Sequence, residues 1–192
     1  MSKIIYNNQL YDKNEFSISI DNRAFLYGDG LFESVKVFNG KAFNLDAHLN
    51  RIFEGAKLLN LDLRIRKKDM KNQIKLLLKA NKIQESVYLK IMIFRKEGGK
   101  YFPANNQASF LIISETDSQK QFKLNKNGIE LGVFSAQLKP KNKLSNFKTI
   151  SALQSILCAN EARKKGKDDC LMLNSENNII ESANSNVFYV KE

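Results

Sequence analysis

Between residues 32 and 80 the apolar residues change from a strand pattern to a helical pattern. Phe32 to Phe38 is rich in β-branched and aromatic residues, and Asn39-Gly40 directly after it is the strongest short hairpin signal in the chain. Two helical segments follow, the first capped by Asn44 or Asp46 and the second running from Lys67 to Ala80. Their buried stripes are predicted to contain Leu49, Ile52, Phe53, Ala56 and Leu59, then Met70, Ile74, Leu77 and Leu78. This region therefore predicts a domain that mixes strands with helices.

Strands are predicted on both sides of this region as well, most strongly at Val87–Arg95 and Ala108–Ser114. The other predicted strands are Lys3–Tyr6, Gln9–Tyr11, Phe16–Ile20, Gly128–Ala136, Cys170–Leu173, Asn178–Glu181 and Asn186–Val190. A third helix is predicted over Ile150–Arg163, with Ile150, Leu153, Leu157 and Ala162 among its buried residues. Residues 115–127 are polar and are interpreted as a linker. We therefore expect one domain over residues 1–118 and a second over residues 119–192.

The chain is basic, with a formal net charge of +11 from 31 Lys and Arg against 20 Asp and Glu. Its lysines are scattered, and the densest clusters, Arg64 to Lys71 and Lys139 to Lys143, contain no interleaved aromatic residues. A solvated surface explains this pattern better than a nucleic-acid interface, so we expect no nucleic-acid partner. The positive field would still attract anionic cofactors and substrates.

Cysteine usage and hydropathy exclude several classes of protein. No apolar run is long enough to cross a bilayer, and the first residues lack the layout of a signal peptide. Cys158 and Cys170 do not form a CxxC pair and are interpreted as buried small hydrophobic residues. We therefore expect a cytoplasmic protein with no membrane partner, no disulfide framework and no metal site.

Two residues near the end of the chain could carry chemistry together. Lys148 lies just ahead of a helical pattern, and Glu181 ends a strand pattern that leads into a small polar loop. A lysine can form a Schiff base with pyridoxal 5′-phosphate (PLP), and a carboxylate can keep the ring nitrogen of that cofactor protonated. Lysines and glutamates are common, so this pair needs support from the rest of the chain.

Four short motifs supply that support, because they occur in order with consistent spacing. They are Tyr27-Gly28-Asp29-Gly30 followed by Phe32-Glu33, then His48-Leu49-Asn50-Arg51, then Lys148, then Glu181 followed by Asn186-Val187-Phe188. With these motifs the chain resembles the class IV aminotransferases, which are PLP enzymes of fold type IV. This family includes branched-chain and D-amino-acid aminotransferases and aminodeoxychorismate lyase. The resemblance covers roughly residues 17–192.

The resemblance implies a role for each matching residue. Lys148 would form the Schiff base and shuttle the proton, Glu181 would bind the ring nitrogen, and Arg51 would bind the PLP phosphate. The backbone of the loop after the glutamate would line the edge of the cofactor, through Ser182, Asn184 and Ser185. His48 is interpreted as a structural support for Arg51. The predicted substrate pocket comprises Phe32, Arg95 and Tyr101.

The resemblance also implies a fold and a choice of chemistries. The fold would be mixed α/β, with a small α/β domain followed by a barrel-like PLP-binding domain, and the enzyme would be a homodimer. The primary function implied by the resemblance would be transamination between amino acids and 2-oxo acids. The lyase is the alternative, since the loop from Arg95 to Tyr101 resembles the corresponding lyase loop and Leu153 stands where branched-chain enzymes carry a tyrosine. Family members continue well past residue 192, so we expect a C-terminally truncated member, and a catalytically impaired scaffold is the third reading.

Overall fold

The computed structural model describes residues 2–83, 86–117 and 124–191, and the chain divides into two compact units. The first holds the residues up to 117 together with Phe147–Ile150, and the second holds residues 124–146 and those from Ser151 onward. The predicted domain boundary after residue 118 lies outside the described residues. Lys148 was assigned to the second domain from the sequence, whereas its segment packs with the first unit.

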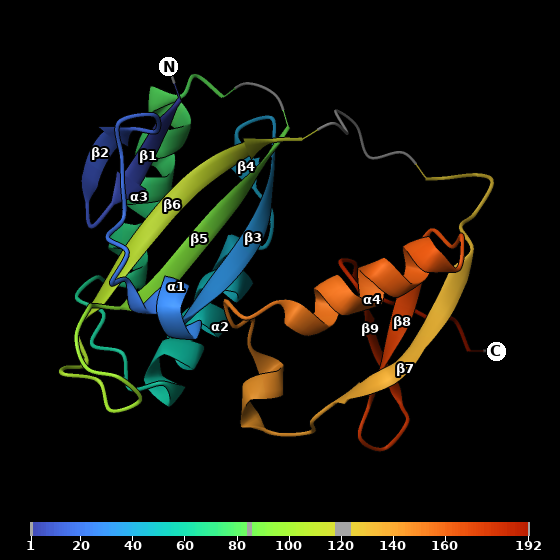
Figure 1. Ribbon diagram of the computed structural model, residues 1–192. Coiled ribbons are helices and arrows are strands. Elements are labelled where there is room, and N and C mark those ends of the chain that lie inside the picture. Colours follow the sequence, from blue (N-terminus) through green and yellow to red (C-terminus); the bar gives the residue numbers. More distant parts are fainter. Residues whose placement is uncertain (1, 84–85, 118–123, 192) are drawn as a thin grey trace. The chain divides into compact units, whose positions relative to one another are not determined.

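The first unit is built on a six-stranded antiparallel sheet, with strand order β2-β1-β6-β5-β3-β4 (Figure 1). Its strands are β1 (Lys3–Tyr6), β2 (Gln9–Asp12), β3 (Gly30–Phe38), β4 (Lys41–Ala42), β5 (Val87–Arg95) and β6 (Ala108–Thr116). The hairpin predicted at Asn39-Gly40 is confirmed, and Asn7-Asn8 forms a second one between β1 and β2. Both residues of each turn have positive φ, between 47° and 71°. Asparagine and glycine tolerate this backbone, which matches the twist of the flanking strands.

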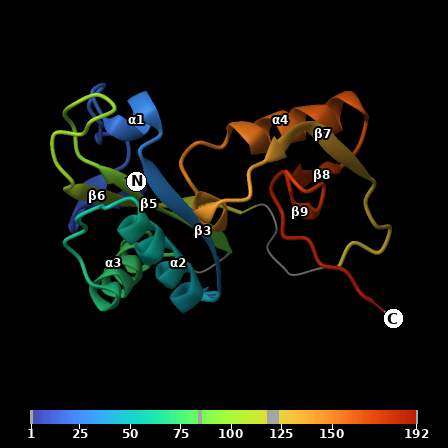
Figure 2. The same cartoon turned by 90° about the horizontal axis from the view of Figure 1, so that it is seen from below.

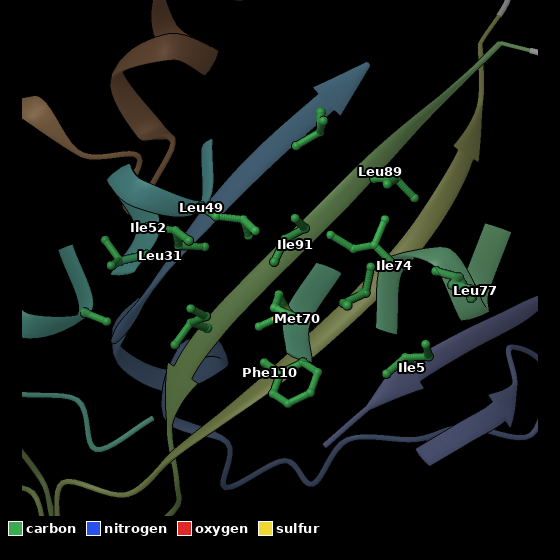
Figure 3. Close-up of a cluster of buried hydrophobic side chains, with 14 of the residues drawn as sticks. Ile5, Leu31, Leu49, Ile52, Met70, Ile74, Leu77, Leu89, Ile91 and Phe110 are labelled. Atoms are coloured by element: carbon green, nitrogen blue, oxygen red, sulfur yellow. The ribbon is translucent and has the colours of Figure 1, made fainter. Parts of the chain in front are cut away.

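Two helices, α2 (Leu45–Leu58) and α3 (Lys67–Ala80), lie together on one side of this sheet (Figure 2). Their apolar stripes pack on the inward side chains of β3, β5 and β6 and form the main core (Figure 3). The predicted stripe residues Leu49, Ile52, Met70, Ile74 and Leu77 are all at most 2% exposed. The two predicted helices are therefore confirmed, and α2 packs against the core side of β3.

The other side of the sheet carries a smaller apolar cluster that includes Ile4, Phe94 and Leu111. Phe16 packs here against the rings of Tyr6 and Tyr11, but the predicted strand at 16–20 is wrong. Apolar and polar residues alternate in that segment, but the segment pairs with no strand among the described residues. Its backbone is therefore irregular. A short helix, α1 (Arg23–Tyr27), follows and ends at Gly28 in the left-handed conformation.

Residues 147–150 add a short antiparallel piece to the part of the β3 edge that β4 does not cover. The amide of Phe32 donates to the carbonyl of Lys148 (2.9 Å), and the amide of Ile150 donates to the carbonyl of Gly30 (3.0 Å). Phe147 packs against the main core, and Gly55 of α2 leaves room for it, since a Cβ at Gly55 would lie 2.9 Å from the Phe147 ring. Long-range pairing therefore fixes the backbone that carries Lys148.

Replacing Gly30 with alanine is expected to destabilise the protein by about 3 kcal/mol, since overpacking forces backbone shifts. A Cβ there would lie 2.5 Å from the carbonyl oxygen of Ile93 and 2.6 Å from the side chain of Ile150. Urea unfolding followed by circular dichroism measures the effect. Ser34→Ala, at an exposed position of the same strand, is the control and should change stability by less than about 0.5 kcal/mol. Equal stability of the two variants would show that this packing is not tight.

The second unit has a three-stranded sheet, β7 (Leu131–Lys139), β8 (Asp169–Asn174) and β9 (Ile179–Ser182), in the order β7-β8-β9. β7 and β8 are parallel, and the connection between them contains a 3₁₀ turn (Lys143–Asn146) and the helix α4 (Leu153–Lys164). The core consists of Phe134, Cys158, Ala162, Cys170, Met172 and Ala183. Both cysteines are fully buried and free, as predicted, and burial raises the pKa of Cys158 to about 11.

The second unit also corrects three details. α4 begins at Leu153 because Ile150 is used at the edge of β3, and Leu153 is 67% exposed where burial was predicted. β7 starts at Leu131 and extends to Lys139, later than expected. Residues 186–190 are not a strand and are exposed. Over the described part of the chain, no helix combines the length and the apolar character that crossing a membrane requires.

Candidate functional site

Lys148 projects from the edge of β3 with its side chain exposed. Its amine lies 5.6 Å from the centroid of the half-buried Phe32 ring, and the amine of Lys90 on β5 lies 5.3 Å from the same ring. The backbone of Lys148 is held by Phe32, so the amine is mobile only through its own side-chain torsions. A primary amine on a fixed backbone beside an aromatic surface is a suitable nucleophile for a carbonyl compound.

Glu33 is the next residue along β3, and its side chain points to the opposite side of the sheet, under α2. It is 1% exposed. Arg51 of α2 donates from Nε to Oε1 (2.5 Å) and from Nη2 to Oε2 (2.6 Å), while Nδ1 of His48 lies 2.7 Å from Oε2. His48 and Arg51 are one helical turn apart, which lets both reach the same carboxylate.

The electrostatics of this cluster keep both partners charged. Burial alone would raise the pKa of Glu33, but hydrogen bonds from Arg51 and His48 outweigh burial and hold that pKa below its ordinary value. The bonds to Glu33 in turn raise the pKa of Arg51. A carboxyl whose pKa is lowered on folding contributes stability above its unfolded pKa, and that stability is lost as pH falls through the folded pKa.

Arg51 keeps one corner for a further partner. Its side chain is 39% exposed, and none of the described residues accepts a hydrogen bond from Nη1. An exposed guanidinium corner suits the oxygens of a phosphate monoester. The predicted phosphate ligand and the predicted Schiff-base lysine thus contact consecutive residues of one strand, Phe32 and Glu33. By its chemistry, Arg51 fits the phosphate of PLP and Lys148 fits its aldehyde.

Glu181 and the loop after it lie in the second unit, at the end of β9. Lys139 of β7 donates to Oε1 of Glu181 (2.5 Å), and both residues line a cavity of about 320 Å³. The loop is closed by Ser182, whose buried hydroxyl bonds to the backbone amide and carbonyl of Ser185 (3.0 and 3.1 Å). Asn184 accepts from the hydroxyl of Ser185 (2.9 Å). A carboxylate beside a turn of small polar residues is well suited to hydrogen-bond a heterocyclic ring nitrogen.

Arg95 and Tyr101, the other two predicted pocket residues, differ in exposure, since Arg95 is buried and Tyr101 is exposed. Arg95 is 7% exposed and is held by Asp29, by Asn106 and by two backbone carbonyls. These bonds occupy its guanidinium and indicate a structural role for it. Tyr101 is 93% exposed, and its ring lies 5.8 Å from the ring of Tyr27.

Reasoning from the sequence assigned no individual role to three residues that the structure singles out. Glu33, Asp29 and Lys139 each hold a charged partner in or near the site. Glu33 could have been found from its position, because it alternates with Leu31 and Val35 on the core side of a strand. A carboxylate buried at such a position requires a cationic partner. Lys139 offers no comparable signal in the sequence.

Residues 30–192 match the family model described as Amino-transferase class IV. The chain is 24% identical over 194 residues to a D-alanine aminotransferase of Staphylococcus haemolyticus and 22% identical over 202 residues to one of Bacillus licheniformis. These alignments cover 100% and 99% of the chain but 67% and 66% of the relatives. The chain therefore spans about two thirds of the length of the curated relatives it matches.

A solved branched-chain aminotransferase of the archaeon Thermoproteus uzoniensis superposes with a TM-score of 0.82 at 24% identity. The superposition covers 95% of this chain and 63% of that structure. The likeness confirms the predicted mixed α/β fold of fold type IV.

Proposed function

The chain belongs to the class IV amino-transferase family, and on that premise we propose that it functions as a PLP-dependent aminotransferase. The substrates would be amino acids and 2-oxo acids, between which an amino group is moved. The names of the D-alanine and branched-chain relatives support this class of substrate.

The observation that carries the proposal is that consecutive residues of β3 each contact one of the two predicted cofactor ligands. The amine of Lys148 lies beside the ring of Phe32, and the guanidinium of Arg51 is held by Glu33, the next residue. An amine nucleophile and a phosphate-binding guanidinium, each placed by contacts with β3, are the two groups that a phosphorylated aldehyde would engage.

PLP, when bound, supplies an electron sink for the bond that is broken at the substrate α-carbon. Arg51 would bind its phosphate through Nη1, the corner that Glu33 leaves available. Lys148 would hold the cofactor covalently through Nζ and then carry a proton on the same nitrogen. For that second task Nζ must be neutral part of the time.

The second unit would contribute its own hydrogen bonds to the cofactor. Glu181 would accept from the ring nitrogen and keep the proton on it. The backbone around Ser182, Asn184 and Ser185 would bind the edge of the cofactor. Phe32 would form an apolar wall, and Tyr101 would contact substrate.

We further propose a homodimer, as the resemblance implies, and a location in the cytoplasm. Two free cysteines, both fully buried, are consistent with a reducing compartment. Sedimentation at several protein concentrations tests the dimer.

The purified protein mixed with PLP is expected to develop a visible absorbance band. Borohydride should remove this band and leave the cofactor mass on the peptide that contains Lys148. A protein that stays colourless and unmodified would contradict the proposed function. Amino transfer to 2-oxoglutarate is expected as the activity, whereas pyruvate release from aminodeoxychorismate without amino transfer would identify the lyase instead.

A further inference from the structure

The contacts of Glu33 go beyond what a helix needs to pack on a sheet. Its neighbours on the core side of β3 are Leu31, Val35 and Val37, all of which are at most 1% exposed. Burying a carboxylate among them is costly unless its oxygens are well bonded, and apolar residues of similar size hold such interfaces as well or better. A buried acid at this position therefore calls for an explanation other than packing.

We propose that Glu33 is a positioning residue, which fixes the guanidinium of Arg51 so that Nη1 faces a phosphate monoester. This inference rests on the proposed function and deepens it, because it adds a residue to the phosphate-binding group. Glu33 itself does not touch the phosphate.

The geometry of the pair supports this role. Glu33 bonds two different nitrogens of one planar guanidinium, Nε and Nη2, at 2.5 and 2.6 Å. Two parallel bonds define the plane of the group and its rotation within that plane. The direction of Nη1 is therefore set before any ligand arrives, and less side-chain freedom is lost when one binds.

His48 further restrains the carboxylate of Glu33. Its Nδ1 lies 2.7 Å from Oε2, the same oxygen that accepts from Nη2 of Arg51. The carboxylate is thus held from two points of α2, one turn apart. Arg66, at the start of α3, provides a comparison. It makes the same Nε and Nη2 contacts, to Asp69 at 2.7 and 3.4 Å, but its side chain is 83% exposed.

The test compares PLP with pyridoxal, which lacks the phosphate. Affinities are measured for the wild type, Glu33→Gln, Arg51→Lys and the double variant. Glu33→Gln is expected to weaken PLP about tenfold, as for one charge-assisted hydrogen bond, and to leave pyridoxal unchanged. Arg51→Lys should give the same selective loss, and the double variant should lose no more than Arg51→Lys alone.

A second readout does not depend on cofactor loading. In the wild type, inorganic phosphate should shift the NMR resonance of the Arg51 Nε–H group, and in Glu33→Gln this shift should be lost at the same concentration. Asp69→Asn is the matched control and should leave both measurements unchanged. Should Glu33→Gln fail to fold, Glu33→Asp takes its place, since it keeps the charge but shortens the reach by one methylene.

Equal loss of PLP and pyridoxal affinity in the Glu33 variant, or no loss, would overturn the positioning role. Failure of the proposed function looks different, because the wild type would then gain no covalent cofactor. The phosphate titration still decides on Glu33 in that case. A wild-type Arg51 resonance that does not respond to phosphate would also overturn the inference.

Discussion

Replacing Lys148 with alanine is expected to abolish covalent attachment of PLP and to leave the fold intact. The contact made by its side chain is with the face of the Phe32 ring, and the side chain is otherwise exposed. Both hydrogen bonds that join this segment to β3 use backbone atoms, the carbonyl of residue 148 and the amide of Ile150, and alanine retains them. An exposed substitution of this kind changes stability by no more than about 0.5 kcal/mol.

Visible absorbance and intact mass after borohydride treatment measure this effect. Lys90→Ala is the matched control, because the Lys90 amine approaches the same ring at 5.3 Å. The control should still be modified, whereas Lys148→Ala should not. If Lys148→Ala gains the cofactor mass and Lys90→Ala does not, the assignment of the nucleophile is wrong.

Replacing Asp29 with asparagine is expected to destabilise the protein by about 3–5 kcal/mol, the range for breaking a buried ion pair. Oδ2 of Asp29 accepts from Nε of Arg23 (2.8 Å) and from Nε of Arg95 (2.9 Å). The two arginine side chains are only 4% and 8% exposed, so water cannot replace the carboxylate. Loss of this one carboxylate charge leaves the two buried guanidinium groups without the counter-charge that they share.

Arg23 also ties a distant loop to this cluster. Its Nη1 donates to the carbonyls of Gly98, Gly99 and Lys100 at 2.7–3.1 Å. Asp29→Asn should therefore release the loop that carries Tyr101 as well as lower the free energy of unfolding. Faster cleavage within residues 98–102 during brief proteolysis would report that release.

Urea unfolding gives the size of the effect. Asp62→Asn is the control, because Asp62 pairs with Arg64 at 3.2 Å while both side chains are more than half exposed (52% and 75%). Surface pairs of this kind contribute no more than about 1 kcal/mol. Similar losses in the two variants would mean that the buried pair is no more important than a surface pair.

Local patterns in the sequence were sufficient for most of the first unit. Each hairpin and helix there depends on residues close together in the chain, such as Asn39-Gly40 or the stripe of α3. Prediction failed where a distant partner decides the structure. Ile150 continues a helical pattern, yet it pairs with Gly30, so the helix starts later. Residues 16–20 have a strand pattern but lack a partner.

The candidate site shows the same division. Lys148 and Arg51 stand in motifs that the sequence makes visible, and their roles stay predictions. Arg95 donates hydrogen bonds to residues 29, 59, 60 and 106, and no local sequence pattern connects these positions. Its burial, and the structural role that its bonds indicate, could therefore be seen only in the fold.

The docking of Phe147–Ile150 on β3 also sets the order in which the protein can mature during synthesis. The residues up to 117 leave the ribosome first, and until the later segment emerges the edge of β3 at Gly30–Phe32 has unpaired backbone groups. Closing so long a loop costs entropy and is slow compared with local pairing. We therefore expect the amine of Lys148 to reach its place beside Phe32 only after the sheet of the first unit has formed.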